Sequence, residues 1–203
     1  MPPARRAARV RRFLVIGHKA ASAPGFSHKD LSGTGGRLDI LARCVGAALL
    51  VSHGLRPDVE LVTLHLGPPT PPKAVRFDGA RLQHANPDER SSALLLEKAL
   101  GAPTTGPVWA ASTPGISVAV MDLAELLDAL RDPIVILDEA GEDVATARIP
   151  ARATFVLGDH LGFTPEEAAL LKARAVASVS LGPVSLQADQ CITVLHNHLD
   201  RRN

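Results

Sequence analysis

The sequence contains no tyrosine, a single tryptophan and only 3% aromatic residues. A surface that stacks a row of RNA bases on aromatic rings is therefore not expected. Cys44 and Cys191 are the only cysteines. Two cysteines are too few for a disulfide framework, which favours a reducing compartment and a cytoplasmic location. The sequence also lacks an apolar run of about 18 residues, so we expect no membrane-spanning helix.

The charges nearly balance, with a formal net charge of +1, but they are distributed unevenly. Residues 1–12 include five arginines and no acidic residue. Such an arm is typical of a segment that binds phosphates, and a leader without contacts is the alternative. We therefore expect a basic arm at residues 1–11. Residues 12–203 are expected to form one domain, because a chain of this length with 46% hydrophobic residues can bury a single core.

Apolar strand-like runs alternate with amphipathic helical segments along the chain. This alternation predicts an α/β fold with a mostly parallel sheet and helices on both faces. The predicted strands are residues 13–16, 59–66, 73–78, 133–137, 154–158 and 177–180, and the predicted helices begin near residues 38, 87, 121, 165 and 188. Gly54 is expected to stop the first helix, and Asn86 and Thr164 are expected to cap the second and fourth.

Two glycine-containing loops follow two of the predicted strands near the end of the chain. Gly158 begins one loop, and Leu181-Gly-Pro-Val-Ser-Leu186 forms the other. Neither loop has a lysine or arginine, so the pair suits a small heteroaromatic ligand better than a triphosphate. Glycine lets the backbone approach such a ligand, and we expect a side chain at Gly158 to fill ligand space while leaving the fold intact. Ordinary turn glycines and core leucines are the alternative.

Cys191 lies on the apolar stripe of the last predicted helix, which indicates an apolar wall rather than a nucleophile. His160, Cys191, His196 and His198 are all residue types that bind metals. His196 and His198, however, are two apart on a helix and therefore roughly 200° apart around its axis, so they cannot converge on one ion. We expect no metal site.

Short blocks between about residue 12 and residue 201 match one protein family in order and spacing. They are Gly35-Gly-Arg-Leu-Asp39, Arg43-Cys-Val45, Ser52-His-Gly54, Pro87-Asp-Glu-Arg90, Ser112-Thr-Pro-Gly-Ile116, Gly141-Glu-Asp-Val144, Gly158-Asp-His160, Cys191-Ile-Thr193 and His196-Asn197. Together they make the chain resemble the SPOUT methyltransferases, most closely the archaeal tRNA pseudouridine N1-methyltransferases. The resemblance implies a C-terminal trefoil knot, S-adenosylmethionine as methyl donor, a homodimer, and N1-methylation of a pseudouridine at position 54 of tRNA.

The resemblance also implies which residues form the site. The cofactor would contact Leu137, Gly158, Leu181, Gly182, Pro183, Val184, Ser185, Leu186 and Cys191. Arg37 and Arg43 would clamp RNA, and Asp39 would orient the target base or take its proton. The alternative for Asp39 is stabilisation of its helix, with Arg43 as an ion-pair partner. Because the cofactor loops lie at the other end of the chain, we expect changes at Asp39 to leave cofactor binding unaffected.

Five positions depart from the family pattern: Ala110, Asp138, Gln187, Asp189 and Gln190. The departures affect the expected reaction chemistry more than the cofactor loops, so two other functions stay open. One is methylation of a different RNA base, such as a pseudouridine in ribosomal RNA. The other is a knotted RNA-binding or assembly protein with little or no transferase activity.

Overall fold

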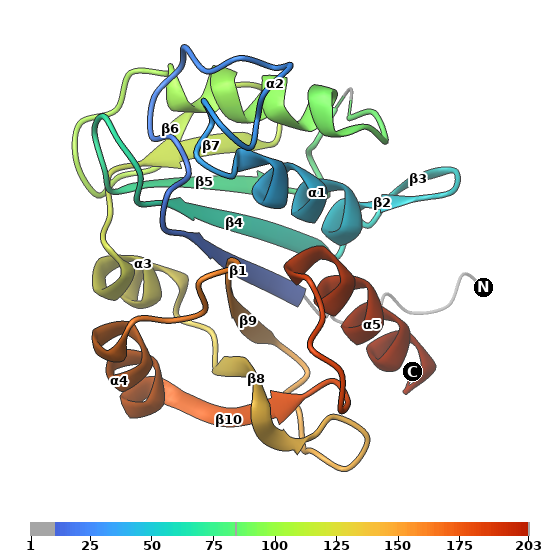
Figure 1. The fold of residues 1–203 in the computed structure, drawn as a ribbon. Coiled ribbons are helices and arrows are strands. Elements are labelled where there is room, and N and C mark those ends of the chain that lie inside the picture. The colour runs from blue at the N-terminus through green and yellow to red at the C-terminus, as the bar shows by residue number, and fades with distance from the viewer. Residues whose placement is uncertain (1–10, 84, 203) are drawn as a thin grey trace.

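The computed structural model describes residues 11–83 and 85–202, which form an eight-stranded sheet flanked by helices (Figure 1). The strand order is β10-β8-β9-β1-β4-β5-β7-β6. The strands from β10 to β4 pair in parallel, whereas β5, β7 and β6 pair antiparallel. The predicted α/β fold with a mostly parallel sheet is confirmed.

The strands of the large sheet are β1 (Arg11–Gly17), β4 (Val59–His65), β5 (Lys73–Asp78), β6 (Ala110–Ala111), β7 (Ile116–Ala119), β8 (Ile134–Asp143), β9 (Ala153–Gly158) and β10 (Ala175–Ser180). A hairpin of β2 (Leu50–Val51) and β3 (Gly54–Leu55) stands apart. The helices are α1 (Leu38–Leu49), α2 (Glu89–Leu100), α3 (Leu123–Leu130), α4 (Pro165–Arg174) and α5 (Ala188–Arg201). No helix in the described part of the chain is long and apolar enough to cross a membrane.

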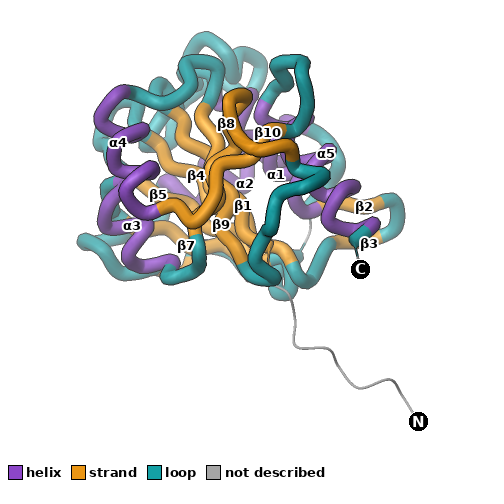
Figure 2. Tube along the Cα trace, turned by 90° about the horizontal axis from the view of Figure 1, so that it is seen from below, coloured by secondary structure: helices purple, strands orange, loops and turns teal. Residues whose placement is uncertain are grey.

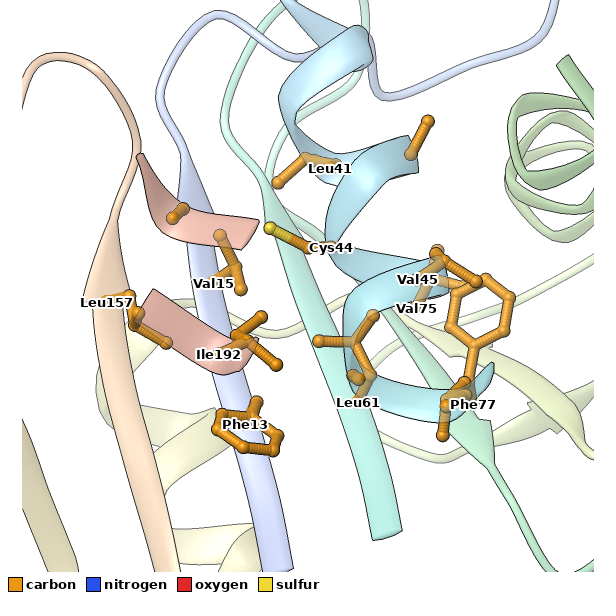
Figure 3. Close-up of a cluster of buried hydrophobic side chains, with 14 of the residues drawn as sticks. Phe13, Val15, Leu41, Cys44, Val45, Leu61, Val75, Phe77, Leu157 and Ile192 are labelled. Carbon is orange, nitrogen blue, oxygen red and sulfur yellow. The ribbon is translucent and has the colours of Figure 1, made fainter. Parts of the chain in front are cut away.

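β1 lies in the middle of the sheet and is buried on both faces. Phe13 and Val15 pack on the side that α1, α2 and α5 cover, while Leu14 and Ile16 pack on the side that α3 and α4 cover. The two groups of helices lie on opposite sides of the strands in Figure 2. Figure 3 shows Ile192 of α5 among the side chains that pack on β1. This two-sided cover explains why the strand sequence is continuously apolar.

Several element boundaries differ from the sequence-based expectation. α1 ends at Leu49, not at Gly54, because the next residues form the β2–β3 hairpin. Asp88, not Asn86, caps α2, since its carboxylate accepts a hydrogen bond from the backbone N–H of Ser91 at 2.8 Å. The short strands β6 and β7 were not predicted. They follow a loop with few apolar residues, and antiparallel pairing of β7 with β5 and of β6 with β7 defines them.

The domain begins one residue earlier than expected. Arg11 is the first residue of β1, and its buried guanidinium pairs with Asp200 at 2.5 Å. Arg12 is also buried and pairs with Glu60 at 2.7 Å and with Asp132. Arg11 of the predicted arm therefore belongs to the fold, together with Arg12. The rest of the arm, residues 1–10, lies outside the described residues.

Candidate active site

The residues expected to hold a cofactor lie near the ends of the parallel strands β8, β9 and β10. Leu137 follows Ile136, the last residue of β8 that pairs with β9. Gly158 is the last residue of β9, and Leu181 directly follows β10. Because ligands of open parallel sheets bind outside the carboxyl ends of the strands, this edge is the place to expect a small-molecule site.

The loop between β10 and α5 offers backbone polar groups beside apolar side chains. Val184, Ser185 and Leu186 donate no backbone hydrogen bond within the part of the chain that the structure describes. Leu181 and Cys191 are half-buried and pack against the main core. Free amide groups next to apolar walls suit a flat heteroaromatic ring with polar edges.

The two glycines of these loops have different structural roles. A Cβ atom on Gly158 would overlap the backbone carbonyl of Gly162, so the tight turn after β9 itself requires glycine. The expectation that a side chain at Gly158 would only fill ligand space is therefore wrong. A Cβ atom on Gly182 would meet no atom within 4 Å, but the φ of 131° at this position is one that other residues rarely adopt.

Cys191 has the properties of a packing residue. Burial raises the pKa of its thiol, and the nearby Asp189 adds to the effect. Its Sγ lies 3.7 Å from the carbonyl oxygen of Leu186. Cys44 on α1 is fully buried, which also raises the pKa of its thiol. Since the thiolate is the reactive form, neither cysteine is activated as a nucleophile.

Arg37, Asp39 and Arg43 form one ionic cluster at the start of α1. Arg37 donates to the carboxylate of Asp39 from Nε at 3.0 Å and from Nη2 at 3.2 Å, and Arg43 donates from Nη1 at 3.1 Å. Burial opposes ionisation of Asp39, but the hydrogen bonds from both arginines lower its pKa overall. A carboxylate held in this way is a weak base. The geometry fits a residue that positions two arginines better than one that accepts a proton.

Arg43 connects this cluster to the cofactor side of the site. Its Nε lies 3.5 Å from Oδ1 of Asp189, which is in the first turn of α5 and two residues before Cys191. The two groups of residues that the sequence places at opposite ends of the chain are therefore linked by one ion pair. The expectation that changes at Asp39 leave the cofactor side unaffected is not supported by this arrangement.

Sequence analysis did not identify His18, which joins the ends of β1 and β9. The backbone N–H of His18 donates to Asp159 at 2.8 Å, and its ring nitrogens lie 3.0 Å from Asp159 and 2.9 Å from Glu167 of α4. Burial disfavours the charged ring, but the bonds to Glu167 and Asp159 raise its pKa. One feature of the sequence could have pointed to His18: a glycine followed by a polar residue, Gly17-His18 and Gly158-Asp159, ends each of two strands that pair with each other.

A hollow of about 400 Å³ opens beside His18, where the loops after β1 and β4 meet. It is lined by His18, Lys19, Ala21, Gly33, Thr34, Gly36, Leu66, Gly67 and Pro68. A smaller hollow of about 120 Å³ lies next to Arg11, at the start of β1. Sequence analysis predicted neither of them.

His196, one of the histidines considered as metal ligands, has other contacts. It is buried, donates from Nε2 to the carbonyl oxygen of Ala48 at 3.0 Å, and packs edge-on against Phe13. Burial lowers the pKa of His196 to about 4. Among residues 11–83 and 85–202, no three His, Cys, Asp or Glu side chains are grouped so that they could hold a metal ion.

Comparison with known proteins identifies the family. Residues 10–203 match the model of a family described as "Putative SAM-dependent RNA methyltransferase". A tRNA (pseudouridine(54)-N(1))-methyltransferase of Methanocella arvoryzae is 45% identical over 195 residues, which cover 95% of this chain and 100% of the relative. The enzyme of the same name from Halobacterium salinarum is 47% identical over 193 residues, covering 94% and 96%. The chain belongs to this family of RNA methyltransferases.

The fold of the methyltransferase is also shared with a solved structure. Nep1 of Archaeoglobus fulgidus, crystallised with S-adenosylhomocysteine, aligns with a TM-score of 0.60 over 95% of this chain and 98% of the Nep1 chain. The sequences are only 14% identical, so this likeness concerns the fold alone. The resemblance to the tRNA pseudouridine N1-methyltransferases inferred from the sequence blocks is confirmed by the family match and the curated relatives.

The departures from the family pattern are accommodated in the methyltransferase. The side chains of Gln187 and Gln190 form a capping box at the start of α5. Asp189 pairs with Arg43. Asp138 is exposed, and its carboxylate accepts a hydrogen bond from the backbone of Ala140 at 2.9 Å. Four of the five positions thus have structural partners, and Asp189 adds an ion pair to Arg43.

Proposed function

We propose that this methyltransferase transfers a methyl group from S-adenosylmethionine to N1 of pseudouridine 54 in tRNA. Relatives with this name are 42–47% identical over nearly the whole chain, and this likeness carries the proposal. The combination of an apolar loop with free backbone amides and a neighbouring arginine cluster supports it, because the reaction needs a nucleoside cofactor and an RNA at one place.

Pseudouridine is chemically suited to this reaction, and uridine is not. In uridine, N1 carries the bond to ribose, whereas in pseudouridine C5 carries that bond and N1 keeps a hydrogen. S-adenosylmethionine supplies an electrophilic methyl group when it is bound. The protein has to place N1 in line with that group and allow one proton to leave, and placement alone can be worth roughly 7–11 kcal/mol in well-oriented systems.

We assign the cofactor to the residues that the family resemblance implied. Leu137, Leu181 and Cys191 are half-buried and would form apolar walls, and the loop of residues 182–186 would meet the polar edge of the adenine ring with its backbone. The free amides of this loop make the residues present compatible with the cofactor. In this assignment Gly158 acts indirectly, by permitting the turn after β9.

We assign Arg37 and Arg43 to RNA binding, with Asp39 as the residue that positions them. The side chains of Arg37 and Arg43 are 37% and 26% exposed, so both guanidinium groups are accessible to phosphate. Asp39 is the partner they share. Residues 1–10 carry three further arginines, and their proposed contact with RNA lies outside the described residues.

We infer that the methyltransferase works as a homodimer in the cytoplasm, with the predicted trefoil knot in its C-terminal segment. β10 is an edge strand, and exposed apolar side chains lie on it and on the loops beside it: Val176, Val184 and Leu161 are 61%, 68% and 53% exposed. Analytical ultracentrifugation should give twice the mass of the chain, and Val176→Asp should shift the species towards monomer. A monomeric wild type would refute the dimer.

The experiment that tests the function is nucleoside mass spectrometry of RNA from a strain that lacks this gene. We expect N1-methylpseudouridine to disappear from its tRNA and to return when the gene is supplied on a plasmid. Loss of the nucleoside from ribosomal RNA instead would identify another substrate. Unchanged nucleosides in both RNAs would leave an RNA-binding or assembly role.

A further inference from the structure

We propose that the hollow beside His18 receives the target nucleotide, with its base against His18 and a neighbouring phosphate on Lys19. This inference rests on the proposed function, because it takes the ligand to be a pyrimidine nucleotide within RNA. The volume of about 400 Å³ lies within the usual range of small-molecule sites.

The position of the hollow relates the methyl acceptor to the cofactor. His18 lines the hollow and is bound through its backbone and its ring to Asp159, the residue after Gly158. The end of β9, which belongs to the proposed cofactor site, therefore contacts a residue that lines the hollow. An acceptor base held there would lie next to the methyl donor, as a direct transfer requires.

The floor of the hollow is rigid because backbone packs directly on backbone. Cβ atoms on Gly36 or Gly67 would overlap the carbonyl of Lys19, so both positions need glycine for this close packing. The backbone N–H of Gly67 donates to Ala20 at 3.0 Å, and that of Leu66 donates to Gly17 at 3.0 Å. A rigid floor holds a base in one orientation at little entropic cost.

The polar groups around the hollow match the charges of a nucleotide. Both ring nitrogens of His18 lie within hydrogen-bond distance of carboxylates, which fixes the orientation of the ring at the wall of the hollow, where a base could stack on it. Lys19 is exposed and forms no ion pair with any residue in the described ranges. An unpaired cation at the rim of a hollow fits a phosphate, while Ala21 and Pro68 line the hollow with apolar atoms.

The first test changes the lysine and leaves the cofactor site untouched. Lys19→Gln should raise the KM for tRNA roughly 10-fold to 100-fold, as expected for loss of a hydrogen bond to a charged group. The slope of log affinity against log salt should become shallower by about 0.7–0.9 for one lost phosphate contact. Binding of S-adenosylhomocysteine and the melting temperature should stay unchanged, since Lys19 is exposed.

Lys29→Gln is the matched control, because Lys29 is an exposed lysine of the same loop that does not line the hollow. We expect this variant to keep the wild-type KM and salt slope. If Lys29→Gln and Lys19→Gln weaken tRNA binding equally, the loop acts only through its general charge, and the assignment of Lys19 fails.

The second test locates the base directly. A tRNA with 4-thiouridine at position 54 should crosslink under ultraviolet light to residues 18–21, 33–36 or 66–68, identified by mass spectrometry of the peptides. The same base in the anticodon arm should not crosslink there. If wild type methylates tRNA but the crosslinks from position 54 fall elsewhere, the hollow is not the acceptor site. If wild type methylates no pseudouridine-containing tRNA, the proposed function itself is refuted.

Discussion

The parallel strands have an arginine–carboxylate network near each of their two ends, but the networks differ in exposure. Where the strands begin, the side chains of Arg11 and Arg12 are 7% and 8% exposed and are bound to Asp200, Glu60 and Asp132. Near the place where the strands end, the side chains of Arg37 and Arg43 are 37% and 26% exposed and share the carboxylate of Asp39.

This difference separates a structural network from a functional one. A buried guanidinium with several partners has no capacity left for a ligand and serves to hold strands and helices together. A guanidinium that stays partly exposed beside its carboxylate partners is held in a defined orientation and can still be reached by a phosphate. The same residue types thus have different roles at the two ends of the strands because they differ in burial.

The largest effect of a substitution is expected in the network where the parallel strands begin. Arg12→Gln should lower the free energy of unfolding by about 3–5 kcal/mol, because it leaves the carboxylates of Glu60 and Asp132 without their buried partner. Urea denaturation measures this change. Arg81→Gln is the control: its side chain is 80% exposed, and its removal should alter stability by less than about 0.5 kcal/mol. Equal losses in the two variants would contradict the structural role of Arg12.

Gly182→Ala should have the next largest effect, which is a loss of cofactor affinity. The φ of 131° would be strained by about 1–2 kcal/mol in alanine, so the loop should shift and binding of S-adenosylhomocysteine should weaken roughly 10-fold. Gly106→Ala is a matched control with a φ of 98°, equally open surroundings and no part in the proposed site. Calorimetry should find normal affinity in this control. Normal affinity in Gly182→Ala would remove the loop from the cofactor site.

Asp39→Asn should have an effect of similar size, but on the rate of methyl transfer. If Asp39 positions Arg37 and Arg43, single-turnover rates should fall about 10-fold, equivalent to about 1.4 kcal/mol. A residue that accepts the N1 proton would instead cost about 10²–10⁴-fold. Because the folded-state pKa of Asp39 is lowered, its contribution to stability is present above its usual pKa and is lost as the pH falls through the folded value. An unchanged rate would leave Asp39 with helix stabilisation only.

His18 should give the smallest effect, in the dependence of stability on pH. Its folded-state pKa is raised above the ordinary value of 6.5, so its stabilising bonds to Glu167 and Asp159 are fully present below pH 6.5 and are lost as the pH rises through the folded value. Unfolding free energies measured from pH 6 to pH 9 should therefore decline more in wild type than in His18→Gln. Parallel curves would show that the ring does not hold the two carboxylates.

The sequence was sufficient for the fold class, because apolar periodicity is a local signal; the cofactor loops stay a prediction that rests on glycine-containing turns and on the family resemblance. Thr164, for example, caps α4 as predicted, through a capping box with Glu167. The charged contacts within the site could not be predicted in the same way. Arg43 meets Asp189, and His18 meets Asp159, only because the chain folds β1 beside β9 and α5 onto α1. The partners are 146 and 141 residues apart in the sequence, so no local pattern can reveal these contacts.

The central claim is that this site methylates N1 of pseudouridine 54, and a pair of tRNAs that differ at one base tests it most directly. The purified methyltransferase would be incubated with labelled S-adenosylmethionine and tRNA that carries either pseudouridine or uridine at position 54. We predict one labelled methyl group per molecule of the pseudouridine tRNA, recovered as N1-methylpseudouridine, and none in the uridine tRNA. Equal labelling of both tRNAs, or of neither, would contradict the account.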